Sequence, residues 1–249
     1  MKKLIYILSI IISTISYAQQ QDAEIWQTYR IKSLKGKTQE FEKAVSKKTR
    51  MFNKSPQDAI FTFKVVDGQD QGMYERVVGF KNWTWFNRSN QKEMDYWMKN
   101  VDPLIESQTG WIVWERIKEY SHNWNPGNAP SKHQLRRSRM VKPSGYSDFL
   151  IVHERMKKVY DKYGYKGIKG LFRCVSGGSE QMFLIVSPFN EYGENAGFEK
   201  SDKNTAELYN EMFGDNAWQK DILKYNSSLV DWGRSAERLT IVKSMSSQN

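Results

Sequence analysis

Hydrophobic and polar positions follow two rhythms along this chain, and the same order of rhythms occurs twice. Alternation with a period of two predicts strands, and apolar residues spaced by three and four predict helices. In the first half the pattern predicts strands at 24–32, 59–68, 73–80 and 110–120, with helices at 37–53 and 90–101. In the second half it predicts strands at 135–143, 168–178, 180–189 and 233–243, a helix at 146–164, and one or two helices within 205–229.

This order is β-α-β-β-α-β in each half, which predicts an α+β fold of two tandem ferredoxin-like units. Each unit places its helices on one face of its sheet, so the other face must be covered as well. Packing the two open faces together, sheet to sheet as an α/β barrel, covers both. We expect the first unit at 19–121, a linker at 122–133 rich in Asn, Gly, Pro and Ser, and the second unit at 134–249.

The duplicated order over 24–243, together with the segment VVGFKNWTWF at 77–86, resembles the dimeric α/β-barrel superfamily, which includes antibiotic-biosynthesis-monooxygenase-like and NIPSNAP-like families. The resemblance implies a space between the sheets that binds small molecules, often aromatic polyketides, quinones or haem. Some members are monooxygenases that act without a metal. Members usually pair as homodimers, so a tandem chain is expected to be a monomer whose two halves form a pseudo-dimer.

The N-terminus has the pattern of a secretory signal at 1–18. Lys2 and Lys3 precede an apolar run from Leu4 to Ile15, and cleavage is expected after Ala18. We therefore expect a periplasmic or secreted protein, and no later stretch is apolar enough for a membrane span. Loss of the two lysines lowers the formal net charge from +10 to +8. No basic run exceeds LRRSR, so we expect no nucleic-acid partner; the charge favours a solvated surface, with docking on an acidic envelope polymer as the alternative.

Polar residues inside apolar strands indicate where a ligand could bind, because burying a charge is costly unless it is paired or binds something. If Ile25, Tyr29 and Ile31 face the helices, their neighbours on the same strand face inward. By this reasoning the candidate ligand-binding residues are Trp26, Thr28, Arg30, Tyr74, Arg76, Trp114, Arg137, Arg139 and Arg173. The hypothesis is a cavity for an aromatic or amphipathic anion. The alternative is that the arginines pair with Glu75, Glu115 and Glu237.

The aromatic residues Trp83, Trp85 and Phe86 either cover a barrel end or line the mouth of a ligand site. Common catalytic motifs are absent, so a cofactor-independent monooxygenase or isomerase remains an alternative to a binding protein. The histidine spacing predicts no metal site. His153 on its helix is an interfacial residue or, if the superfamily's haem chemistry applies, an axial ligand. Cys174 lies within the apolar strand LFRCV and is expected to be buried.

Overall fold

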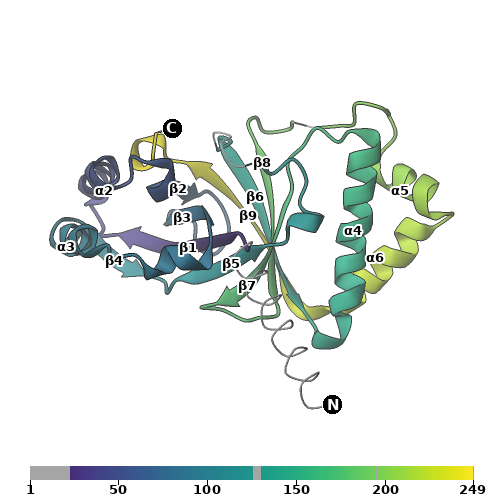
Figure 1. Cartoon of the computed structure of the whole chain (residues 1–249), viewed down its shortest axis with the longest axis horizontal. Helices are drawn as coiled ribbons and strands as arrows, with labels where there is room; N and C mark the ends of the chain where they lie inside the picture. The colour runs from purple at the N-terminus through teal and green to yellow at the C-terminus, as the bar shows by residue number, and fades with distance from the viewer. Residues whose placement is uncertain (1–22, 126–129, 195, 249) are drawn as a thin grey trace, which may run out of the picture.

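The computed structural model of the chain describes residues 23–125, 130–194 and 196–248, so the predicted signal at 1–18 lies outside the described residues. A closed barrel occupies the middle of the molecule (Figure 1), with helices α2 and α3 on one side and α4, α5 and α6 on the other. Among the described residues, no helix is both long and apolar enough to cross a bilayer.

Strands and helices follow the predicted order in both halves. The first half contains β1 (Ile25–Ser33), α2 (Thr38–Phe52), β2 (Ile60–Val65), β3 (Tyr74–Lys81), the 3-10 helix η2 (Trp83–Asn87), α3 (Gln91–Asn100), β4 (Ile105–Gln108) and β5 (Ile112–Arg116). The second half contains β6 (His133–Val141), α4 (Tyr146–Tyr163), β7 (Gly170–Ser176), β8 (Met182–Phe189), α5 (Thr205–Phe213), α6 (Ala217–Ser228) and β9 (Leu229–Ile241). The short strand β4, which pairs with the end of β1, was not predicted, because its sequence IESQ does not alternate.

The sheet closes because β1 pairs with both β3 and β5. Around the barrel the strands run β1, β3, β2, β9, β6, β8, β7 and β5, and every pair is antiparallel. Within each half the order is fourth, first, third, second strand, which is the ferredoxin-like order. The pairs β2–β9 and β5–β7 join the halves. The predicted α+β barrel is therefore confirmed.

Alternation along the strands divides the side chains between the helices and the barrel interior. Tyr29 and Ile31 of β1 are buried with Phe41 and Val45 of α2 and Trp97 of α3. This confirms the predicted orientation of β1 toward its helices. In the second half, buried residues of β6 to β8 pack in the same way against α4. This helix stops at Gly164, the end of the predicted range, where the glycine takes the left-handed conformation with φ +67°.

Candidate functional site

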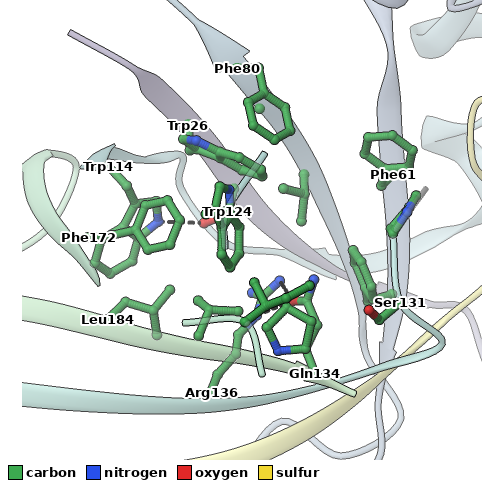
Figure 2. Close-up of a pocket in the computed structure, with 18 of the residues that line it drawn as sticks. Trp26, Phe61, Phe80, Trp114, Trp124, Ser131, Gln134, Arg136, Phe172 and Leu184 are labelled. Atoms are coloured by element: carbon green, nitrogen blue, oxygen red, sulfur yellow. Dashed lines mark hydrogen bonds between the residues drawn. The ribbon is translucent and has the colours of Figure 1, made fainter. Parts of the chain in front are cut away.

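A cavity of about 420 Å³ lies in the barrel interior. Aromatic rings from both halves of the chain surround it, as Figure 2 shows for Trp26, Phe61, Phe80, Trp114, Trp124 and Phe172. Aliphatic side chains of β8, Leu184 and Val186, complete the apolar wall. A cavity of this size and composition suits a small organic molecule.

A local distortion of β3 shapes one wall of the cavity. The register between β1 and β3 shifts between Ile25 and Gln27, and Phe80 takes a left-handed backbone conformation with φ +56°. Phe80 thereby joins the inward face instead of following Val78 outward, and its ring lies 4.6 Å from that of Trp26. The neighbouring Gly79 leaves room for this indole, since a Cβ there would lie 2.4 Å from the Trp26 ring. The bulge and the glycine together fix the position of Trp26.

Few hydrogen-bonding groups interrupt the aromatic wall. The Trp114 Nε1–H donates to Thr28 Oγ1 at 3.0 Å, so both groups are satisfied. The Trp124 Nε1–H is buried and has no partner among the described residues. Because a buried unpaired donor costs about 1–3 kcal/mol, a ligand that supplies an acceptor to Trp124 would recover that energy.

A network of ion pairs lies beside the aromatic wall. Arg136 donates to Gln134 Oε1 from Nε at 3.0 Å and from Nη2 at 2.9 Å, and its Nη1 pairs with the Glu75 carboxylate. Arg30 also reaches Glu75, from Nε at 2.9 Å, and pairs with Glu237 and Asp70. Burial, followed by the nearby Arg30, lowers the pKa of Arg136 to about 9, so its guanidinium is still charged at neutral pH.

The predicted site residues of the first half divide between the two faces of the sheet. Trp26, Thr28 and Trp114 line the cavity, and the structure brings them together. Arg30 lies on the same face but belongs to the ion-pair network. Tyr74 and Arg76 point the other way, since Tyr74 packs with Phe41 under α2 and Arg76 donates to Thr49 and Thr62.

The inward orientation predicted for Arg137, Arg139 and Arg173 is wrong. Arg137 lies near Tyr160 of α4 and Tyr225 of α6. Arg139 also lies near Tyr225, where its charge opposes the rise that burial gives the pKa of that tyrosine. Arg173 pairs with Glu115 at 2.7 Å and has 46% of its side chain exposed. All three lie on the outer faces of their strands. The alternative of pairing with Glu75, Glu115 and Glu237 therefore describes Arg30 and Arg173.

Residues that the sequence analysis missed also line the cavity: Phe61, Phe63, Val77, Trp124, Gln134, Arg136, Phe172, Leu184 and Val186. In β6, arginines occur at 136, 137 and 139, so alternation allowed either set to face inward. The apolar residues of this strand are Leu135, which is partly exposed, and Met140 and Val141 at its end, so they gave no clear alternation. For Trp124 the position in the predicted linker gave no orientation.

None of the three rings of the aromatic segment after β3 is among the described residues that line the barrel cavity. Trp85 and Phe86 line a second cavity on the outer face of the first half, whereas Trp83 is 37% exposed. The alternative that these rings line the mouth of a ligand site thus concerns that outer cavity. Cys174 is buried with Trp114 and Phe172, as predicted.

Haem does not fit the barrel cavity. Its described lining residues include no His, Cys, Met or Tyr, the side chains that usually hold haem iron. His153 lies elsewhere, on α4, with ring centroids of Phe149 and Tyr225 at 4.7 and 5.9 Å. Within the described ranges, no three His, Cys, Asp or Glu residues form a cluster suited to a metal ion.

Comparison with known proteins gives matches to solved structures only. No family model and no curated protein sequence matches the chain. A "putative monooxygenase" of Lactobacillus acidophilus NCFM aligns over 88% of this chain and 94% of its own, with 10% identity and a TM-score of 0.54. Another, from Fusobacterium nucleatum subsp. nucleatum, aligns over 88% and 93%, with 12% identity and a TM-score of 0.56.

A chlorite dismutase from Candidatus Nitrospira defluvii aligns over 90% of this chain and 94% of its own, with 5% identity and a TM-score of 0.48, which supports no statement about function. The two monooxygenase matches, at such low identity, establish the fold alone. Strand order, closure through β1 and helices on both outer faces agree with this result. The chain shares the closed α/β-barrel fold of these two proteins.

Proposed function

We propose that this is an exported protein that binds a small, mainly apolar aromatic molecule inside its barrel. The observation that carries the proposal is the cavity of about 420 Å³ whose walls are aromatic rings from both halves of the chain. Stacked and edge-to-face aromatic contacts recognise planar rings without requiring charge. The signal pattern at 1–18 is the support for a periplasmic or secreted location.

Charge in the network argues for a neutral ligand instead of the anion expected from the sequence. Arg136 and Arg30 already share the Glu75 carboxylate, and Arg30 also pairs with Glu237 and Asp70. A ligand carboxylate would have to displace one of these carboxylate partners and would meet the remaining negative charges. Trp124 Nε1–H is free to donate, which favours a ligand with a carbonyl acceptor, such as a quinone.

The lining also favours binding over acid-base catalysis. Arg136 is the one titratable side chain among the described residues that line the cavity, and arginine does not act as a base near neutral pH. General base catalysis requires a His, Glu, Asp, Lys or Tyr within hydrogen-bond reach of the substrate. The cavity as built therefore suits holding a ligand.

The first experiment is native mass spectrometry on the protein purified from its own host, to detect a small molecule that co-purifies. Binding of menadione, a neutral naphthoquinone, is then titrated by calorimetry. Val186→Trp fills part of the cavity and should weaken menadione binding at least tenfold. Trp124→Phe removes one donor and should weaken it severalfold, whereas Trp232→Phe, the same type of change at a fully exposed tryptophan, should leave it unchanged.

Two results would overturn the proposal. One is a chain that carries no co-purified molecule and binds no menadione. The other is menadione binding that Val186→Trp does not weaken, since the ligand would then lie outside the barrel.

A further inference from the structure

A second cavity, of about 370 Å³, lies on the outer face of the first half. It lies between η2, α3 and the outward side chains of β1 and β3. Thr28 lines the barrel cavity, whereas the next residue, Tyr29, lines this outer cavity. Because neighbouring residues of a strand point to opposite faces, the sheet separates the two cavities.

The outer cavity has an aromatic wall of its own. Tyr29, Trp97 and Trp111 contribute rings, and the Tyr29 and Trp111 centroids are 3.9 Å apart. Trp85 also lines the cavity, and the Arg88 guanidinium covers its ring at 3.9 Å from the centroid. Arg88 in turn pairs with Asp58, so these two charges cancel.

Next to this cavity Arg76 is fully buried without a carboxylate partner. Its Nη1 donates to Thr62 Oγ1, Met245 O and Thr49 Oγ1, at 2.8, 3.0 and 3.2 Å, while Nε and Nη2 have no partner among the described residues. The other buried arginine of the sheet, Arg136, has Glu75. A buried charge without a counter-charge costs several kcal/mol. Arg76 thus lies beside the cavity with no carboxylate in direct contact.

Tyr29 and Lys48 connect Arg76 with the cavity. Burial raises the pKa of the Tyr29 hydroxyl, and the adjacent Arg76 opposes this rise. Lys48 lines the cavity with only 4% of its surface exposed and donates from Nζ to Glu93 and to Asn53 Oδ1. Burial, then the repulsion from Arg76, lowers the pKa of Lys48 to about 8. Lys48 and Arg76 are therefore two buried cations that lie near each other, and Glu93 is a carboxylate near both of them.

Unused donors point to an acceptor that would complete this cluster. An ammonium has three N–H bonds, and Lys48 uses two. The Trp85 Nε1–H is buried at the cavity without a partner in the described part of the chain. Asp102 also lines the cavity, but Glu93 is the carboxylate whose charge raises the pKa of Arg76.

We propose that the outer cavity is a second binding site, for a small aromatic carboxylate. The carboxylate accepts from Lys48 Nζ and Trp85 Nε1 and balances the charge of Arg76, while the ring stacks among Tyr29, Trp97 and Trp111. Hydrogen bonds to a charged group are worth about 1.5–3 kcal/mol each, which corresponds to roughly 10- to 100-fold in affinity. The site would therefore discriminate a carboxylate from a neutral ligand of the same shape.

Calorimetric titration of the full chain with 2-naphthoate, and with 2-naphthol as its neutral counterpart, tests the proposal. We expect 2-naphthoate to bind at least about tenfold more tightly. Trp85→Phe keeps a ring but removes the N–H, and should weaken 2-naphthoate about tenfold with little effect on 2-naphthol. The control is Trp83→Phe, the same change two residues earlier in η2 at a residue that does not line the cavity, and it should have no effect.

Arg76→Met and Lys48→Met should remove the preference for 2-naphthoate over 2-naphthol. If either variant fails to fold, which circular dichroism would show, Trp85→Phe still decides. Equal affinity for the two probes would overturn the proposal, as would no binding of 2-naphthoate at 1 mM. So would weakening of 2-naphthoate by the barrel variant Val186→Trp and not by Trp85→Phe. Menadione binding to the barrel should not respond to Trp85→Phe, so the two sites fail or hold separately.

Discussion

Replacement of Glu75 by glutamine tests whether the ion-pair network is held together by one shared carboxylate. Glu75 and Arg136 are 3% and 4% exposed, and Glu75 also accepts from Arg30 Nε at 2.9 Å. Glutamine keeps the shape, but its NH₂ group would face one of the two guanidinium groups. Arg136 would lose its carboxylate partner, because Arg30 alone retains Glu237 and Asp70.

Breaking a buried ion pair from one side costs about 3–5 kcal/mol. Glu115→Gln is the matched control, because Glu115 pairs with Arg173, whose side chain is 46% exposed. An exposed pair contributes about 0–1 kcal/mol. In urea unfolding at pH 7, Glu75→Gln should lower the midpoint by about 1 M or more, and Glu115→Gln by a few tenths of that shift.

A second variant separates loss of charge balance from loss of shape. In Glu75→Gln combined with Arg136→Met the unpaired buried cation is gone, so part of the lost free energy of unfolding should return. If Glu75→Gln and Glu115→Gln shift the midpoint equally, or if the double variant is no more stable than Glu75→Gln, the reasoning about the shared carboxylate is refuted.

Three further predictions concern a turn, a histidine and the oligomeric state. In urea unfolding, Gly177→Ala should destabilise the fold by about 2 kcal/mol or more beyond the effect of Gly193→Ala. Both glycines have φ near +80°, but only at Gly177 would a new Cβ lie 1.9 Å from Trp111 O. Equal effects of the two substitutions would contradict this. Burial, with a contribution from Arg139, lowers the pKa of His153 to about 4, whereas the unfolded value is 6.5. Between these pH values the unfolded state therefore binds more protons than the folded state. The free energy of unfolding should then fall as the pH falls through this range, by up to about 1.4 kcal/mol per pH unit. His153→Leu should remove that acid-dependent loss, and an unchanged pH profile would argue against it. Sedimentation equilibrium should give a monomer, because the chain supplies both halves of its barrel, and a dimer would refute the predicted monomeric state.

Sequence alone determined the elements and their order, because each strand and helix is specified by local periodicity. The alternation in β1 placed Tyr29 and Ile31 toward the helices and Trp26 and Thr28 toward the interior. Gly164 ended α4 where a positive φ was needed. The strand β4 escaped prediction, since it is defined by its pairing with β1 and not by its own pattern.

Tertiary structure decided which charged residues lie together. Alternation could not decide whether Arg136 or Arg137 faces the barrel interior, since these two adjacent residues are both arginines. Packing of β6 against α4 and α6 decided that Arg136 faces inward. The bulge at Phe80 reversed the face that strict alternation would give it. Arg76 was selected from the sequence as a ligand-binding residue of the barrel, yet its strand turns it toward the outer cavity, where it lacks a carboxylate. A period-two pattern specifies that neighbours point apart, whereas the identity of each face depends on contacts between segments far apart in the chain.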